Sequence, residues 1–258
     1  MSVYDSWRFI KEVKKKPENF YIIHYSCQSL YDGNEALSPR ITSIAITHYA
    51  SEQTISFSTH SIAEELHIPR ESVRDRFDDV ERSLLEGFYA FVRDRRDKYW
   101  VHWNMRNLAF GFEHLEHRHR VLGGKDAPVI PVERRLNLSD LLSDRYGGGY
   151  VSDPKMKSLM ELNGYNRPHL LTGEEEVQAF QANEFLRIHN STLAKVGFFS
   201  HVIRSLVKGS LNTASRGWGV FLDRVFEGRT AKTVGLTATL ITIGVGIWQI
   251  GIWLGWIK

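Results

Sequence analysis

The first part of the chain alternates short apolar runs with polar connections, a pattern typical of β-strands. Apolar or alternating residues fill the runs at 20–27, 41–49 and 54–60. A short basic helix over 4–16 is predicted before these runs, because Pro17 ends its pattern. Three strands with short connections predict an antiparallel meander.

From residue 80 onward the apolar residues change to helical spacing. Val80, Leu84, Phe88 and Val92 recur every three or four residues, which places them on one face of a helix. Because strands that alternate with helices pair in parallel through crossovers, the sequence predicts an α/β fold with a mixed five-stranded sheet and flanking helices. The sheet is expected to be antiparallel first and parallel afterwards. Further strands are predicted over 99–103 and 136–142, and further helices over 108–122, 155–163, 174–189 and 193–207.

The composition indicates a folded globular body. Of the 258 residues, 42% are hydrophobic and 24% are charged, which excludes a disordered or collagen-like chain. Cys27 is the one cysteine, so the sequence excludes an internal disulfide and a multi-cysteine metal centre. The net charge of +3 is too small to indicate a nucleic-acid partner by itself. These features predict no cofactor.

The charges are distributed unevenly, because residues 233–257 carry no charged side chain. This segment meets the roughly 20 apolar residues that a helix needs to cross a bilayer. Lys232 precedes it, and Trp253 and Trp256 lie near its far end, where an aromatic belt is expected. The sequence therefore predicts a single-pass C-terminal membrane anchor with the main domain in the cytoplasm. A buried core helix is the alternative.

Small residues in the same segment predict self-association. Gly251 and Gly255 form a GxxxG step, and Gly244 adds further small surface. We therefore expect a homo-oligomer through the membrane helix, with the lipid bilayer as a partner. The predicted organisation is an N-terminal helix at 1–17, a main domain at 18–207, an amphipathic juxtamembrane linker at 208–232 and a transmembrane helix at 233–257.

Several stretches of the main domain match the pattern of a known fold. FYIIHYSCQSL stands at the first strand, VHWNMRNLAFGFEHL at the fourth, and LNLSDLL followed by KMKSLMELNGY at the fifth. Over residues 18–207 the chain resembles the ribonuclease H-like fold, in its DEDD 3′–5′ exonuclease branch. The resemblance implies four carboxylates that hold two divalent metal ions, which activate a water and stabilise the leaving oxygen.

The acids that carry this chemistry in the family are largely replaced here. The D-x-E pair of the first strand falls on His24 and Ser26, and the acid expected after Asn104 falls on Leu108. Three of the four metal-binding carboxylates are therefore missing, and we expect an exonuclease-like scaffold without two-metal catalysis. The last helix offers Glu175, Glu176 and Glu184, without a clear motif.

Polar residues near the ends of the predicted strands form a candidate ligand site. Open α/β sheets bind ligands in the crevice beyond the carboxyl ends of their strands. Histidines in that position can bind a phosphate, a nucleotide or a metal ion, and packing in the core is the alternative for the strand histidines. The candidate ligand-binding residues are His24, Ser26, His102, Asn104, Arg106, Asn107 and His189.

Basic residues cluster at 14–16, 93–98, 118–120 and 134–135. Clusters of this kind bind nucleic-acid backbones or anionic lipid headgroups. Because most of these clusters have acids close by, we expect each of them to be solvated surface.

Three functional hypotheses follow. The leading one is a tail-anchored membrane protein whose cytosolic, catalytically inactive domain binds nucleic acid or a nucleotide. A sensor domain joined to a self-associating span is the layout of a membrane effector, for example in bacterial antiviral defence. The second is a membrane-tethered nuclease with a rearranged metal site that uses acids such as Asp32, Asp140 or Glu176. The third is a protein-interaction scaffold.

Overall fold

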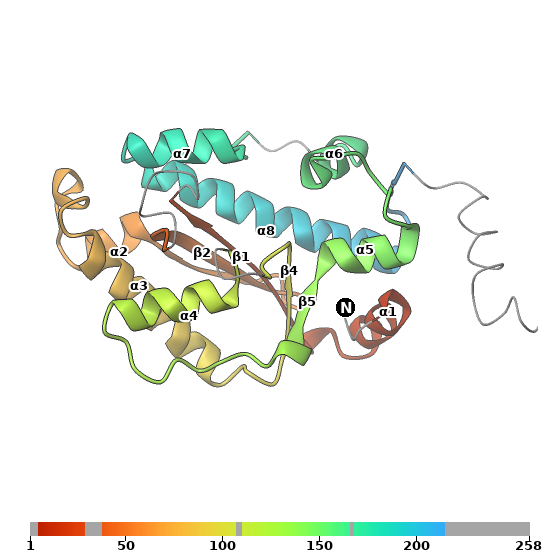
Figure 1. Cartoon of the computed structure of the whole chain (residues 1–258). Helices are drawn as coiled ribbons and strands as arrows, with labels where there is room; N and C mark the ends of the chain where they lie inside the picture. The colour runs from red at the N-terminus through yellow and green to blue at the C-terminus, as the bar shows by residue number, and fades with distance from the viewer. Residues whose placement is uncertain (1–4, 29–37, 107–109, 166–167, 215–258) are drawn as a thin grey trace, which may run out of the picture. The chain divides into compact units, whose positions relative to one another are not determined.

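The computed structural model describes residues 5–28, 38–106, 110–165 and 168–214. Residues 1–213 form one compact unit, and residues 214–258 form a second. The described part is an α/β structure (Figure 1). Its helices and strands are α1 (Ser6–Lys15), β1 (Phe20–Cys27), β2 (Ile41–His48), β3 (Thr54–Ser58), α2 (Thr59–Glu65), α3 (Phe77–Arg93), β4 (Tyr99–His102), α4 (Phe112–Val121), β5 (Arg135–Asn137), α5 (Leu138–Tyr146), α6 (Lys155–Leu162), α7 (Gly173–Gln181) and α8 (Phe185–Lys208).

The described strands form one five-stranded sheet in the order β3-β2-β1-β4-β5. β1 and β2 are antiparallel, as are β2 and β3. β4 pairs in parallel with β1 on one side and with β5 on the other. The predicted mixed sheet, antiparallel first and parallel afterwards, is confirmed. The pairing of β1 with β4 covers residues 20–22, so residues 24–27 extend past the paired part of β4.

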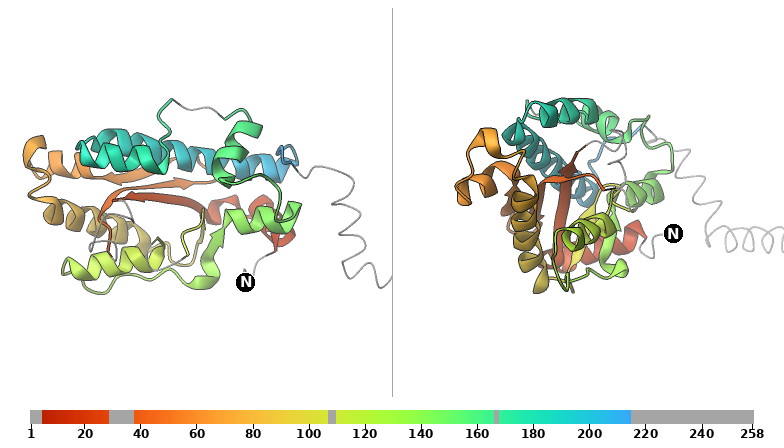
Figure 2. Two further views of the ribbon diagram at one scale, coloured as in Figure 1. Left: turned by 45° about the horizontal axis from the view of Figure 1, so that its top comes forward. Right: turned by 60° about the vertical axis from the view of Figure 1, so that its left-hand side comes forward.

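Helices cover both faces of the sheet (Figure 2). The helices α2, α3 and α4 lie on one face, and α8 crosses the other face with α1 and α5 beside it. Side chains alternate between the faces along β1: Phe20 and Ile22 belong to the core under α8, whereas Ile23 and Tyr25 belong to the core under α3. His24 and Ser26 continue the first series, so they point to the α8 face.

The prediction of a strand over 136–142 is wrong for most of its length. β5 ends at Asn137, whose side chain accepts a hydrogen bond from Ser139 N and caps helix α5. Leu138, Leu141 and Leu142 are buried on one side of that helix. Their spacing of three and four residues is helical. The prediction failed because a short apolar run does not distinguish the period of a helix, about 3.6 residues, from that of a strand, about two residues.

Two other element boundaries differ from the prediction. The expected break between helices at 190–192 is absent, and α8 runs unbroken from Phe185 to Lys208. The break lies earlier, where Asn183 adopts a positive φ of 57° between α7 and α8. The third strand ends at Ser58, and the following residues turn into helix α2, which the sequence pattern did not predict.

Two basic clusters predicted as solvated surface each contain a buried arginine that forms ion pairs. The side chain of Arg118 is 8% exposed and contacts Glu81, which is fully buried. The side chain of Arg135 is 10% exposed and pairs with Glu113 and Glu116. The solvated-surface prediction is therefore wrong for these two arginines. Each is buried because acidic side chains on neighbouring helices form ion pairs with its guanidinium group.

Within the described ranges, no helix is both long enough and apolar enough to cross a membrane. The predicted membrane helix at 233–257, with Gly244, Gly251 and Gly255, lies outside these ranges. So does the predicted linker from residue 215 onward.

Candidate functional site

A cavity of about 1040 Å³ opens beyond the carboxyl end of β1. The last residues of β1 form one wall, and residues 103–106, which follow β4, form another. The first turn of α7 and the start of α6 complete it. The polar and charged side chains in its lining include His24, Ser26, Asn104, Arg106, Lys155, Glu174, Glu176 and Lys195.

A single carboxylate oxygen in this cavity receives three donors. Glu176 Oε1 accepts hydrogen bonds from Lys195 Nζ at 2.7 Å, Ser191 Oγ at 2.9 Å and Ser26 Oγ at 3.1 Å. The side chains of Lys195 and Glu176 are only 9% and 14% exposed. Thr192 Oγ1 lies 2.9 Å from Ser26 Oγ and extends the network. The Lys195 ammonium therefore neutralises the Glu176 carboxylate inside the protein.

The neighbouring ionisable groups of β1 are held in their neutral forms. Burial, followed by repulsion from Lys195 and His102, lowers the pKa of His24 well below its usual value. His24 Nδ1 has no hydrogen-bond partner within the described part of the chain. Burial raises the pKa of Cys27 to about 12. A thiol with such a pKa is a poor nucleophile at neutral pH, so the structure does not favour a Cys–His nucleophile.

Aromatic rings form the apolar side of the cavity. Trp103 and Phe110 both line it. Trp103 is stacked on Phe199 with ring centroids 5.7 Å apart, and His24 packs edge-on against Phe110 and Phe199. Stacked rings beside cationic side chains are the surfaces that proteins offer to nucleobases and phosphates.

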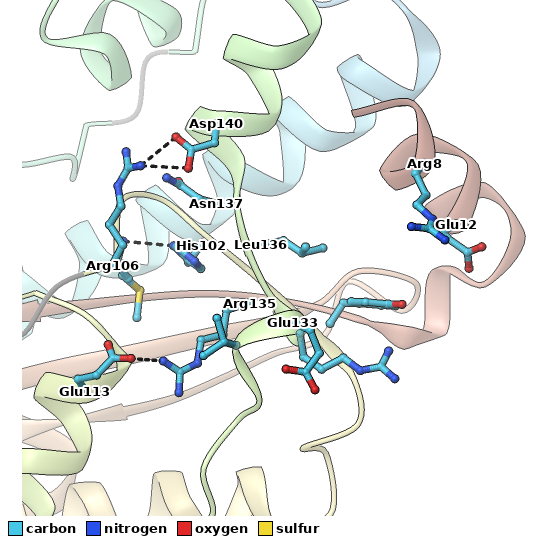
Figure 3. Close-up of a pocket in the computed structure, with 14 residues that line it drawn as sticks. Arg8, Glu12, His102, Arg106, Glu113, Glu133, Arg135, Leu136, Asn137 and Asp140 are labelled. Carbon is cyan, nitrogen blue, oxygen red and sulfur yellow. Dashed lines mark hydrogen bonds and ion pairs between the residues drawn. The ribbon is translucent and has the colours of Figure 1, made fainter. Parts of the chain in front are cut away.

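A second cavity of about 770 Å³ lies beside β4 and β5, and Arg106 lines both cavities (Figure 3). Arg106 Nη1 donates to both carboxylate oxygens of Asp140 at 3.0 Å, and Nη2 donates to Asn104 Oδ1 at 2.7 Å. Asn104, at φ 55°, receives a further hydrogen bond from Asn137 Nδ2 at 3.2 Å. This network fixes Asn104 and Arg106 after β4 and holds Arg106 between the two cavities.

His102 faces the second cavity and not the first. Its ring packs against Phe112 of α4. Its Nδ1 accepts a hydrogen bond from Met105 N at 3.2 Å, marked by a dashed line in Figure 3. Burial and the nearby cations Arg106 and Arg135 lower the pKa of His102 to about 3. A neutral imidazole that accepts a backbone N–H is a structural residue, as the core alternative predicted.

The structure brings together four of the seven predicted ligand residues. His24, Ser26, Asn104 and Arg106 line the larger cavity. His189 does not, because its Nδ1 lies 2.8 Å from Ser43 Oγ and its Nε2 lies 3.3 Å from Ser56 Oγ, on β2 and β3. The expectation that His189 converges with His24 is therefore wrong. His102 lies close enough to His24 to contribute to its lowered pKa, but it lines the second cavity. Asn107 lies outside the described residues.

Sequence reasoning predicted Arg106 but missed the two lysines of the cavity, Lys155 and Lys195. Lys195 lies within the apolar stretch of α8, and Lys155 begins α6. A lysine among apolar helical residues signals a buried partner, because an unpaired buried charge is costly. The sequence does not show which helix supplies that partner, so Glu176 and Lys195 were not connected.

The donor set of the cavity does not fit a pair of divalent metal ions. His24 and Ser26 stand where the resemblance implied the first two acids, and the Glu176 carboxylate already binds an internal cation. Among the described residues, no group of three or more histidine, cysteine, aspartate or glutamate side chains is arranged to hold a metal ion. Two dications require several anionic oxygens, which this arrangement does not supply.

We therefore expect millimolar Mg²⁺ or Mn²⁺ to leave the Tm of the protein unchanged within about 1 °C. In the variant Ser26→Asp/Lys195→Met, a second acid faces Glu176 and the internal cation is gone. Saturating Mn²⁺ should raise the Tm of that variant by about 5–10 °C. Circular dichroism melting of both proteins, with and without EDTA, checks this. A metal-dependent rise of similar size in the native protein would contradict it.

No protein-family model, curated protein or solved structure matches this chain.

Proposed function

We propose that the main domain binds a nucleotide or the end of a nucleic-acid strand in the larger cavity, without cleaving it. The observation that carries the proposal is that the partly exposed Phe110 ring and the cation Lys155 line one cavity at the end of a central strand. Stacking on Phe110 accounts for a base, and Lys155 accounts for a phosphate. The Glu176–Lys195 pair supports binding over catalysis, because its carboxylate is already paired and the described residues hold no cluster of three or more potential metal ligands.

We also propose that the domain is a ribonuclease H-like domain with degenerate exonuclease acids. The strand order β3-β2-β1-β4-β5, with the first three strands antiparallel and the last two added in parallel, supports this proposal. The positions of His24 and Ser26 at the end of the central strand, facing α8, support it further.

The remaining part of the proposal concerns location. The uncharged segment 233–257 supports a membrane anchor, with the main domain on the cytoplasmic side. Its glycines at 244, 251 and 255 support self-association in the bilayer. A domain that binds a nucleotide and a span that assembles would together form a membrane effector.

Binding by the cavity is tested with Lys155→Ala. Lys155 lines the cavity, and its Nζ donates to Gly148 O at 3.0 Å. A charge-assisted contact to phosphate contributes about 1.5–3 kcal/mol, so its loss should weaken binding by about tenfold or more. Isothermal titration of the full chain in detergent, with adenosine monophosphate and with a short single-stranded oligonucleotide in EDTA, measures the effect. Lys157→Ala removes the same charge from an exposed position outside the cavity and is the matched control.

Other results would favour the other hypotheses. Equal binding by both lysine variants would place the ligand elsewhere. Manganese-dependent cleavage of the oligonucleotide that Glu176→Gln abolishes would make the protein a tethered nuclease. If neither adenosine monophosphate nor the oligonucleotide binds, the result would favour the protein-interaction scaffold.

A further inference from the structure

The exposed face of α1 presents a tryptophan among lysines. Trp7 is 64% exposed. Lys11 and Lys14 follow it at intervals of four and three residues, so they share its side of the helix, and Lys15 lies at the margin. All three lysines are exposed. The Arg145 guanidinium, from the end of α5, lies 3.9 Å from the centre of the Trp7 ring. This face therefore combines a large aromatic ring with several cations.

The acids near α1 do not neutralise this face. Glu12 lines the smaller cavity with Arg8, on another side of the helix (Figure 3). Asp5 caps the helix by accepting a hydrogen bond from Arg8 N at 2.6 Å. Asp144 accepts hydrogen bonds from both Ser6 N at 2.9 Å and Ser6 Oγ at 2.5 Å. The Trp7 face remains cationic.

Packing fixes the orientation of this face. Phe9, Ile10 and Val13, on the opposite side of α1, are buried in the same core cluster as Val202 and Leu206 of α8. Because that contact and the Ser6–Asp144 hydrogen bonds hold the helix in place, Trp7 and the lysines cannot rotate toward the core.

The position of α1 in the unit agrees with a membrane role. Its core partners belong to the C-terminal half of α8, and both lie at the same end of the unit in Figure 1. From that half of α8 the chain continues toward the uncharged segment 233–257. If that segment lies in a bilayer, the domain is tethered through the end that carries α1.

We propose that this face of α1, formed by Trp7, Lys11, Lys14 and Lys15, binds the anionic headgroups of the bilayer that anchors the chain; the proposal rests on the proposed anchor. Tryptophan prefers the headgroup region, and each basic residue near an anionic surface strengthens attachment by about fivefold. The same contact would fix the orientation of the ligand cavity relative to the membrane. A nucleic-acid backbone attracts lysines as well, but the exposed tryptophan and the membrane anchor proposed for this chain favour lipid.

The test uses the full chain in vesicles of phosphatidylcholine, with and without phosphatidylserine. Lys15→Cys, in a Cys27→Ser background, carries an environment-sensitive dye. We expect a blue shift of its emission in the vesicles with phosphatidylserine, and we expect high salt to reverse it. The further substitutions Lys11→Glu and Lys14→Glu should abolish the shift. Arg120→Glu with Lys125→Glu, two exposed residues in and after α4, makes the same change of charge and should preserve it.

The possible outcomes distinguish failure of the α1 contact from failure of the proposed membrane anchor. Equal emission in both kinds of vesicle would overturn the α1 contact. A shift on addition of single-stranded RNA, with none caused by phosphatidylserine, would overturn it in favour of nucleic acid. Extraction of the chain by alkaline carbonate would overturn the anchor alone, because the dye reports the contact of α1 in either case.

Discussion

Acidification from about pH 7 to about pH 5 is expected to remove about 6 kcal/mol of the free energy of unfolding. The cause is a set of buried histidines that the fold holds neutral. Burial lowers the pKa of His102 to about 3 and the pKa of His114 and His189 to about 4. All three side chains belong to residues that are less than 9% exposed. His24, with a pKa well below its usual value, adds to the effect.

The sign follows from proton uptake. In the unfolded chain these histidines titrate near their usual pKa of about 6.5, whereas in the folded protein they titrate at or below about 4. Between these values the unfolded state binds more protons, so stability is fully present above about pH 6.5 and is lost as the pH falls toward 4. At about pH 5 each of these three histidines lowers the free energy of unfolding by about 2 kcal/mol. Burial raises the pKa of Glu81 and Glu116, which opposes the loss in part.

Urea unfolding of the full chain in a nonionic detergent, followed by circular dichroism, measures this dependence. Residues 233–257 contain no titratable side chain, so the pH dependence of the unfolding transition comes from the rest of the chain. His189→Gln should reduce the slope between about pH 5 and pH 6 by about 1.4 kcal/mol per pH unit. His169→Gln makes the same change at an exposed position between α6 and α7 and is the matched control. A stability that is constant from pH 7 to pH 5 would contradict the neutral histidines.

The antiparallel half of the sheet could be predicted from the sequence because its strands are long. β1 covers the predicted residues 20–27, and β2 covers 41–48 of the predicted 41–49. β5 has only three residues, too few to show the alternation of buried and exposed side chains that marks a strand. The leucines of α5 were therefore included in the predicted strand. Length decides this difference, because a short apolar run fits both periods.

The candidate site could be predicted only where local sequence decides the geometry. His24 and Ser26 are two residues apart on one strand, so they share a face whatever the fold. His102 lies on the neighbouring strand β4, so the face of the sheet to which it points depends on how β4 pairs with β1. In the structure it points toward α4. The Glu176–Lys195 pair joins two helices, and only their packing brings the two side chains together. Contacts within one element were accessible from sequence, whereas contacts between elements were not.

Loss of one buried arginine is expected to destabilise the protein by about 3–5 kcal/mol. The Arg118 guanidinium donates from Nε to Glu81 Oε1 at 2.9 Å and from Nη2 to Glu81 Oε2 at 2.5 Å. Glu81 also accepts a hydrogen bond from Ile41 N at 2.8 Å, which ties α3 to the start of β2. Arg118→Met keeps most of the side-chain volume but leaves the Glu81 carboxyl buried without its cation. The carboxyl must then stay charged at high cost or take up a proton.

A second substitution separates the lost charge from lost packing. In Arg118→Met/Glu81→Gln no charge remains to be buried, while the amide oxygen still accepts the hydrogen bond from Ile41 N. We therefore expect the double variant to recover part of the stability that Arg118→Met loses, although replacing either partner alone is costly. Arg120→Met, an exposed position two residues along the same helix, should change the free energy of unfolding by no more than about 0.5 kcal/mol. Urea unfolding at pH 7 compares the three variants. Equal losses in Arg118→Met and Arg120→Met would show that Glu81 does not depend on Arg118, and that α3 and α4 are held together by their apolar contacts alone.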